Sequence, residues 1–158
     1  MADESFELDV HVDGSPEALE AWWTDLPAVH EAEDPREQPH RIEHVETTDD
    51  AEIYETYWRG PLGIEYSLTE ELYDEGPGRW RFVVPNPGFT IQDHYEVEPE
   101  GEGARLRIRS QITYENVLGK LVRRVMVPNW KDQFHETFTS AVAVFEDRQT
   151  VHPSPAET

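Results

Sequence analysis

Residues 6–23 read FELDVHVDGSPEALEAWW, and the spacing of their apolar side chains changes in the middle of this stretch. Up to Val12, apolar and polar residues alternate, which is the two-residue period of a strand with one buried face. After it, Ser15 is a favourable N-cap residue, Pro16 suits the first helical position, and Glu17 places a negative charge near the positive end of the helix dipole. The stretch therefore predicts a strand that leads directly into a helix.

The predicted helix has one apolar face, because its large apolar residues are spaced three and four apart. These residues are Leu19, Trp22, Trp23 and Leu26. The two neighbouring tryptophans therefore lie on the same side of the helix. Residues 27–40 carry three prolines and many charges, so we expect a connector there with at most a short helical turn.

From about Ile42 to Tyr114, extended segments alternate with sequences typical of turns. The turn sequences fall at residues 47–50, 59–63, 74–78, 86–88 and 98–103. They divide this region into six segments, which predict an antiparallel meander. Within the segment at 51–59, Tyr57 and Trp58 cannot both face inward, and the pattern leaves open which one does.

The apolar pattern also predicts the register of two hairpins. In the hairpin at 89–114, the expected pairs are Val97–Leu106 and Tyr95–Ile108 inside and Glu98–Arg105 and Glu96–Arg107 outside. In the hairpin at 64–84, they are Leu72–Trp80 and Leu68–Val84 inside and Glu71–Arg81 outside. Because glutamates face the arginine row at 105, 107 and 109, we interpret that row as a solvated, paired surface rather than an anion site.

Residues 115–147 return to helical spacing, with two apolar stripes separated by Pro128. The first consists of Leu118, Leu121, Val122, Val125 and Met126, and the second of Trp130, Phe134, Phe138, Ala141 and Phe145. Proline breaks or kinks a helix interior, so we expect a short helix followed by a long one from about Pro128. We expect one domain over residues 5–147 and a flexible tail over residues 148–158.

The composition is strongly acidic, with 34 acidic against 13 basic residues and a formal net charge of -21. Such a surface repels phosphate backbones and anionic lipid headgroups, so we expect neither a nucleic-acid partner nor membrane insertion. Only Lys120 and Lys131 are lysines. An acidic, lysine-poor composition is typical of extreme halophiles, whose salt screens repulsion between carboxylates. An acidic mesophilic protein is the alternative.

The chain contains no cysteine, which excludes disulfides, thiolate metal sites and a cysteine nucleophile. The amino terminus has no basic region followed by an apolar run, and no stretch approaches the roughly 20 apolar residues of a membrane span. We therefore expect a cytoplasmic protein. Neither an H-E-x-x-H nor a G-x-S-x-G motif is present, and we predict no metal and no cofactor.

The order of these segments, from the opening strand and helix through the meander to a long final helix, resembles the helix-grip fold of the START-related (SRPBCC) superfamily. This superfamily includes birch-pollen-allergen-like proteins, polyketide cyclases and dehydrases, coenzyme-Q-binding proteins and Hsp90 ATPase activators. Three stretches carry the resemblance: residues 6–23, EPEGEGARLRIRSQITY at 98–114, and PNWKDQFHETFTSAVAVFED at 128–147. All three are signatures of a fold, and none is a catalytic signature.

The resemblance implies an α+β protein in which a seven-stranded antiparallel sheet wraps around the long C-terminal helix. It also implies a cavity between the sheet and that helix, closed at one end by the apolar face that holds the two tryptophans. We expect this cavity to bind a small hydrophobic or amphipathic molecule. The candidate ligand-binding residues are Trp22, Tyr66, Trp80, Phe82, Asp93, Tyr95, Ser110, Trp130, Phe134 and His135.

Asp93 is the polar candidate, because it interrupts the inward apolar pattern of its strand opposite Ser110. A carboxylate in an apolar interior is costly unless it is hydrogen-bonded or wet. Asp93 therefore either pairs with a neighbour such as Ser110 or lines a polar patch, unless a bulge turns it outward. Glu70 breaks the pattern of its strand in the same way. His135 lies beside the second helical stripe and could reach the cavity edge.

Two other functions stay open at this point. The first is a cyclase- or dehydratase-like enzyme, in which Asp93, His135 or a tyrosine would act as general acid or base. The second is a protein-interaction module similar to the Hsp90 activators, which would require an exposed apolar patch. The sequence decides neither the catalytic residues nor the oligomeric state.

Overall fold

The structure is a computed structural model that describes residues 2–31 and 39–151. Its elements are β1 (Glu4–Val12), α1 (Pro16–Trp23), α2 (Leu26–Glu31), β2 (Arg41–Thr47), β3 (Ala51–Arg59), η1 (Pro61–Gly63), β4 (Glu65–Asp74), β5 (Arg79–Asn86), β6 (Phe89–Glu100), β7 (Gly103–Tyr114), α3 (Val117–Met126) and α4 (Trp130–Val151). The predicted six-strand meander corresponds to β2–β7.

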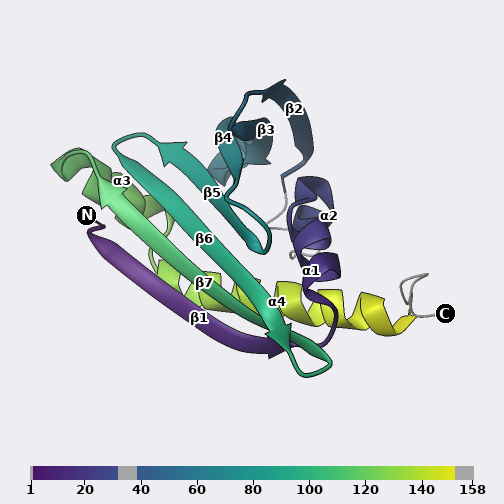
Figure 1. The fold of residues 1–158 in the computed structure, drawn as a ribbon. Coiled ribbons are helices and arrows are strands. Elements are labelled where there is room, and N and C mark those ends of the chain that lie inside the picture. The colour runs from purple at the N-terminus through teal and green to yellow at the C-terminus, as the bar shows by residue number, and fades with distance from the viewer. Residues whose placement is uncertain (1, 32–38, 152–158) are drawn as a thin grey trace.

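All seven strands form one antiparallel sheet in the order β1-β7-β6-β5-β4-β3-β2. The helix α4 crosses one face of this sheet, and α1 and α2 lie beside the sheet on the same side (Figure 1). The opening strand β1 pairs with β7, the last strand of the meander, and forms one edge of the sheet. The predicted α+β helix-grip architecture is confirmed.

The helix α1 begins as the sequence predicts and ends earlier. The Ser15 hydroxyl accepts a hydrogen bond from the backbone N–H of Ala18 at 3.1 Å, which satisfies one free donor of the first turn. The helix ends at Trp23, and Leu26 begins the separate helix α2. The apolar face nevertheless packs inward, since Leu19, Trp23 and Leu26 are buried. The rest of the predicted connector, residues 32–38, lies outside the described residues.

The predicted register is confirmed for one hairpin and wrong for the other. Between β6 and β7, the four predicted pairs are all present. Between β4 and β5, Leu72 lies opposite Phe82 rather than Trp80, and Arg81 lies opposite Tyr73 rather than Glu71. The predicted Leu68–Val84 pair is absent, because the pairing begins at Glu71–Val83. The shift of two residues keeps every side chain on its predicted face.

The longer turn between β4 and β5 explains this shift. The backbone N–H of Glu75 donates to the carbonyl oxygen of Arg79 at 3.0 Å, which leaves three residues in the loop. Gly78 adopts a φ of 74°, and a Cβ atom there would lie 2.6 Å from the carbonyl oxygen of Val97. Only glycine fits this close approach, so the loop is fixed by backbone geometry that apolar alternation does not encode.

The structure also decides which aromatic residue of β3 faces the interior. The Trp58 indole lies inside, where its N–H donates to the Thr56 hydroxyl at 2.9 Å. The Tyr57 ring lies on the outer face, 3.9 Å beneath the Arg41 guanidinium.

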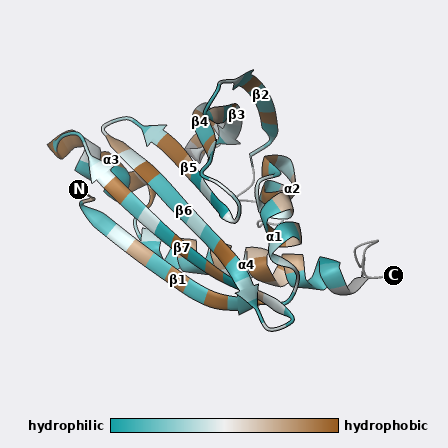
Figure 2. Cartoon of the chain, in the orientation of Figure 1, coloured by the Kyte–Doolittle hydropathy of each residue, from teal (hydrophilic) through white to brown (hydrophobic). Residues whose placement is uncertain are grey.

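The C-terminal region forms a short helix and a long helix, as predicted, with Pro128 between them. The long helix α4 continues through Val151 and so includes the first residues of the predicted tail; residues 152–158 lie outside the described residues. Most of its predicted stripe is buried in the main core, whereas Trp130 joins a smaller cluster with Phe89, Ile91 and Ile112. Figure 2 shows that hydrophobic residues also occur on α3, at the outer end of the molecule.

None of the helices in the described part of the chain is long and apolar enough to span a membrane.

Candidate functional site

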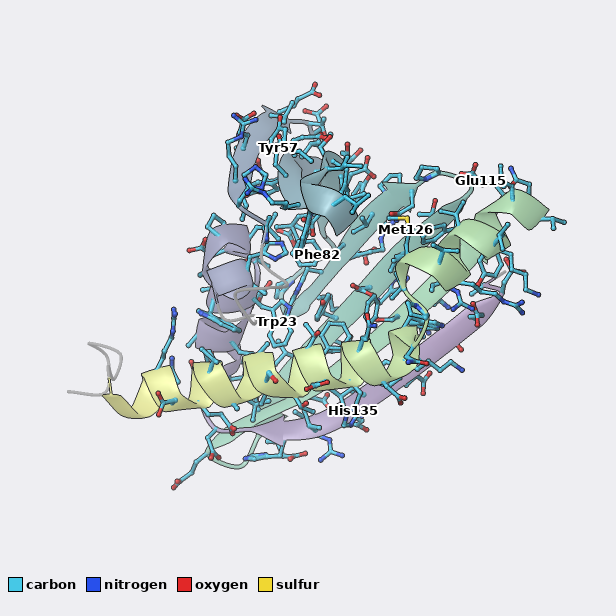
Figure 3. The ribbon with its side chains drawn as sticks, turned by 180° about the vertical axis from the view of Figure 1, so that it is seen from behind. Trp23, Tyr57, Phe82, Glu115, Met126 and His135 are labelled. Carbon is cyan, nitrogen blue, oxygen red and sulfur yellow. The ribbon has the colours of Figure 1, made fainter. Side chains whose placement is uncertain are left out.

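A cavity of about 740 Å³ lies between the sheet, the α1–α2 pair and the N-terminal half of α4. Most of its wall is apolar. The apolar lining residues are Trp23, Leu26, Val29, Trp58, Tyr66, Leu68, Phe82, Val84, Ile91, Tyr95, Val127, Phe134, Phe138 and Ala141. Figure 3 shows the molecule from behind, with Trp23 and Phe82 on the side of the sheet that faces α4.

Tyr95 of β6 holds together the aromatic part of this wall. Its ring stacks in parallel on Trp80, with ring centroids 5.1 Å apart, and meets Phe82 edge to face at 5.8 Å. It also meets Phe138 of α4 edge to face at 6.2 Å. Stacked and edge-to-face aromatic pairs bury apolar surface and also fix the orientation of each ring. The rings therefore form a pre-arranged surface for an apolar ligand.

Asp93 is the carboxyl group in the middle of this wall. The β6–β7 pairing runs without a bulge, so Asp93 keeps its inward direction, opposite Ser110. The fully buried Ser110 hydroxyl donates a hydrogen bond to Asp93 Oδ1 at 2.5 Å. Burial raises the pKa of Asp93 to about 7. The Ser110 hydrogen bond lowers this pKa in part, and the charge of the nearby Glu70 raises it further. At neutral pH both its protonated and its ionised forms are therefore populated.

A second polar pair, Glu70 of β4 and His30 of α2, lines the same cavity. Glu70 Oε2 lies 3.2 Å from His30 Nε2, and the two side chains are only 12% and 10% exposed. The His30 ring also meets Trp58 edge to face, with ring centroids 5.7 Å apart. The cavity therefore combines an acid of raised pKa with a carboxylate–imidazole pair.

Five of the predicted ligand-binding residues line the cavity together: Tyr66, Phe82, Asp93, Tyr95 and Phe134. Ser110 lies behind Asp93 and acts on it through their hydrogen bond. Trp80 supports Tyr95 from behind and lines a different hollow.

The other three predicted residues lie away from the cavity wall. Trp22 packs between Trp23 and Phe145, with ring centroids 5.6 Å from each. Trp130 is buried in the smaller core cluster. His135 is exposed on α4, where its ring meets the edge of Phe6 at 6.1 Å.

Sequence reasoning identified Glu70 as a break in a strand pattern but did not identify His30. His30 lies in the six-residue helix α2, just after its proline-containing first turn. The apolar spacing in so short a segment does not predict which way the His30 side chain points. The only signal was the spacing of Leu26, Val29 and His30, which is helical but spans a single turn. Among the described residues, no group of three or more His, Asp or Glu side chains is arranged to hold a metal ion.

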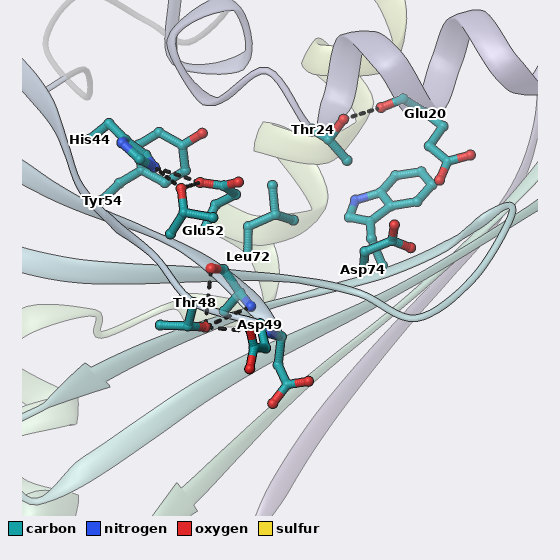
Figure 4. Close-up of a pocket in the computed structure, with 13 residues that line it drawn as sticks. Glu20, Thr24, His44, Thr48, Asp49, Glu52, Tyr54, Leu72 and Asp74 are labelled. Carbon is teal, nitrogen blue, oxygen red and sulfur yellow. Dashed lines mark hydrogen bonds and ion pairs between the residues drawn. The ribbon is translucent and has the colours of Figure 1, made fainter.

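A second hollow, of about 720 Å³, has the opposite character. It lies beside the β2–β3 turn and the end of α1 and is lined largely by carboxylates and threonines, as Figure 4 shows. Its carboxylates are Glu20, Asp49, Asp50, Glu52 and Asp74. Several polar groups there bond one another, for example the Thr47 hydroxyl donating to Glu52 at 2.7 Å. We call this second hollow the polar groove.

Solved structures of other proteins share this fold at low sequence identity. A protein from Thermus thermophilus is 20% identical, with a TM-score of 0.64, over 96% of this chain and 100% of that one. An aromatase/cyclase from Streptomyces sp. R1128 is 11% identical, with a TM-score of 0.66, over 93% and 95%. Ara h 8.0201 is 10% identical, with a TM-score of 0.64, over 90% and 97%. At these identities the likeness concerns the fold alone.

No curated protein matches the chain. The sequence profile of the family described as "Polyketide cyclase / dehydrase and lipid transport" matches residues 3–146, which is nearly the whole described structure. The chain therefore belongs to the polyketide cyclase/dehydrase and lipid transport family.

Proposed function

We propose that this protein binds a small hydrophobic or amphipathic molecule in the cavity between the sheet and α4. The observation that carries this proposal is a largely apolar hollow of about 740 Å³ that contains a few convergent polar groups. Ligand pockets typically measure roughly 300–1,000 Å³ and combine an apolar wall with a small number of polar groups. The polar groove has a similar volume but lacks this apolar wall.

The polar groups suggest how the ligand is oriented. Its apolar body would lie against Tyr95, Phe82 and Phe134, and a carbonyl or hydroxyl group would face Asp93. The protonated form of Asp93 can donate a hydrogen bond to a carbonyl, and the ionised form can accept one from a hydroxyl. A ligand group at this position would be a second partner of the carboxyl group, beside Ser110.

A cyclase- or dehydratase-like activity is the second candidate, and one observation favours it. Asp93 and the Glu70–His30 pair face the same cavity, so a proton donor and a proton acceptor are available to one bound molecule. General acid–base catalysis requires such a pair near one reacting centre. This candidate predicts that Asp93→Asn retains ligand binding but abolishes turnover.

We also propose that the protein works at high salt in the cytoplasm. The support is its formal net charge of -21 with only 13 basic residues. At about 1 M salt the Debye length falls to roughly 3 Å, so most repulsion between surface carboxylates disappears.

The ligand proposal is tested by native mass spectrometry of the protein purified in high salt, followed by solvent extraction and identification of any retained molecule. We expect a mass increase corresponding to one apolar or amphipathic molecule per chain. The double variant Leu68→Trp/Thr137→Trp, which fills the cavity from both sides, should lose this molecule. Retention of the same molecule by the filled variant would place it elsewhere and contradict the proposal.

A further inference from the structure

The helix α3 directs its apolar side toward solvent instead of toward the core. Val117, Leu118, Leu121 and Val125 are between 58% and 86% exposed in the described structure. They follow the three- and four-residue spacing that normally marks the buried side of a helix. Large aliphatic side chains scattered singly on a surface are ordinary, but a continuous stripe on one helix is not.

Two contacts fix α3 in this orientation. Gly119 packs directly against the backbone of Gly88 in the β5–β6 turn, so closely that neither position can carry a side chain. Four residues later, Arg123 is buried and bonds Glu4 at 2.8 Å and the Tyr114 hydroxyl at 2.9 Å. Residues four apart lie on the same side of a helix. The inner side of α3 is therefore built from a glycine and an ion pair, and its aliphatic side must face outward.

A second exposed aliphatic group belongs to the connection between β3 and β4. Leu62 is 98% and Ile64 is 64% exposed, and the backbone N–H of Gly60 closes the loop by donating to the carbonyl oxygen of Ile64 at 2.7 Å. In the antiparallel sheet, this connection lies at the same end of the strands as the β5–β6 turn, against which Gly119 of α3 packs. We call the apolar rim the set of Leu62, Ile64, Val117, Leu118, Leu121 and Val125.

The apolar rim lies next to the cavity described above. Tyr66, two residues after Ile64, lines the cavity and is itself 39% exposed. Val127, which directly follows α3, lines the cavity from the other side. The two parts of the rim therefore flank the same cavity.

The charge of α3 is opposite to that of the whole chain. The ten residues of α3 include no carboxylate, and its exposed cations are Lys120 and Arg124, although the exposed Glu115 lies just before the helix. Arg59 adds an exposed cation beside the β3–β4 connection. Glu65 is the acidic neighbour there, and it lies 3.2 Å from His40. A short amphipathic helix with an exposed aliphatic side and flanking cations has the composition that binds a membrane interface.

We propose that the apolar rim docks this protein onto the surface of a lipid bilayer with anionic headgroups. Lys120 and Arg124 would contact phosphates while the aliphatic side chains enter the boundary with the acyl chains, and an apolar ligand would then move between bilayer and cavity. This proposal rests on the proposed ligand-binding function. At low ionic strength the same headgroups repel the acidic remainder of the surface, which orients the protein with the rim toward the membrane.

The test is co-sedimentation with vesicles of equal parts phosphatidylcholine and phosphatidylglycerol, compared with phosphatidylcholine alone. We expect Leu121→Glu and Val125→Glu each to weaken binding to both vesicles by at least about tenfold, since a charge replaces an inserted aliphatic group. Lys120→Gln and Arg124→Gln should each weaken binding about fivefold, and only on the anionic vesicles. The matched control is Val45→Glu, whose valine is 59% exposed on the edge strand β2 and should bind like the wild type.

The outcomes separate docking from ligand binding. Circular dichroism checks that every variant is folded, and titration with N-phenyl-1-naphthylamine, an uncharged apolar probe, reports on the cavity. Vesicle binding without probe binding would refute the proposed function and support docking alone. Docking is refuted if the wild type binds neither vesicle, if Val45→Glu weakens binding as much as Leu121→Glu, or if ultracentrifugation shows a dimer that Leu121→Glu dissociates.

Discussion

The two halves of α4 present similar aromatic residues to the sheet but pack in different ways. In the C-terminal half, Phe145 is fully buried against Trp22, and a Cβ atom on Gly14 would lie 2.7 Å from its ring. In the N-terminal half, Phe134 and Thr137 border the cavity and remain partly exposed to it. We call the region around the C-terminal half of α4, where the core is filled, the solid end. We call the region around its N-terminal half, which borders the cavity, the hollow end.

The difference shows that an apolar stripe on a helix does not decide whether the space opposite it is filled. The helix α1 covers the C-terminal half of α4 and supplies Trp22 and Leu19 to fill the gap. It ends at Trp23, and beyond it the wall of the cavity contains the Glu70–His30 pair and Asp93 among its apolar groups. Polar groups at the hollow end are the ones that a bound molecule can satisfy.

The largest expected effect tests the solid end. Phe145→Ala should lower the free energy of unfolding by about 3–5 kcal/mol, because it leaves a cavity that its close neighbours cannot fill. The measurement is chemical denaturation in high salt. A loss below about 1 kcal/mol would mean that this end is also loosely packed.

Asp93→Asn should remove a pH dependence of stability from the hollow end. The pKa of Asp93 is raised in the folded state to about 7, from about 4 in the unfolded chain. The folded protein therefore binds the proton more tightly, and stability falls as the pH rises from about 4 to about 7. Each pKa unit corresponds to about 1.4 kcal/mol, so the wild type should lose roughly 2–4 kcal/mol over this interval through Asp93.

The measurement for Asp93 is denaturation at several pH values, and Asp147→Asn on the exposed side of α4 is the control. Asp93→Asn should be more stable than the wild type near neutral pH, whereas the control should follow the wild-type profile. An unchanged profile in Asp93→Asn would show that water or another group compensates the buried charge.

A smaller effect is expected for Phe134→Ala, which has the same chemistry as Phe145→Ala. Because the Phe134 ring is only partly buried and borders an existing hollow, its removal should cost about 1–2 kcal/mol of unfolding free energy. The same variant should bind N-phenyl-1-naphthylamine more weakly, which Phe145→Ala should not. Equal stability losses in the two variants would contradict the distinction between the solid and the hollow end.

The smallest effect concerns salt. Transfer from about 1 M to about 0.1 M potassium chloride lengthens the Debye length from roughly 3 to 10 Å and restores repulsion between carboxylates. The melting temperature should fall by about 5 °C, because the folded state concentrates these charges. Sucrose of matched osmolality should not restore it, and an unchanged melting temperature in low salt would refute the proposed adaptation.

The sequence predicted those parts of the fold where two independent patterns agree. In the β6–β7 hairpin, apolar pairs inside and charge pairs outside require the same register, and this register is present. In the β4–β5 hairpin, the loop around Gly78 adds length that alternation cannot reveal.

The candidate site was predicted where a residue breaks a regular period. Asp93 was found because it interrupts strand alternation. The alternatives left open for it were a partner such as Ser110, a place in a polar patch, or an outward bulge; the structure has both the Ser110 hydrogen bond and a place in the cavity wall. His30 lies in a segment too short to have a period. The stripe on α3 was recognised, but its direction depends on Gly119 and Arg123, whose partners Gly88 and Glu4 are distant in the sequence.

The most direct test of the account is a fluorescence titration of the wild type with N-phenyl-1-naphthylamine, beside two double variants that each add two tryptophans. Leu68→Trp/Thr137→Trp fills the cavity, and Thr47→Trp/Asp49→Trp fills the polar groove of similar volume. The account predicts one site per chain in the wild type, affinity at least about tenfold weaker in the cavity variant, and wild-type affinity in the groove variant. Equal binding by the wild type and the cavity-filled variant would contradict it.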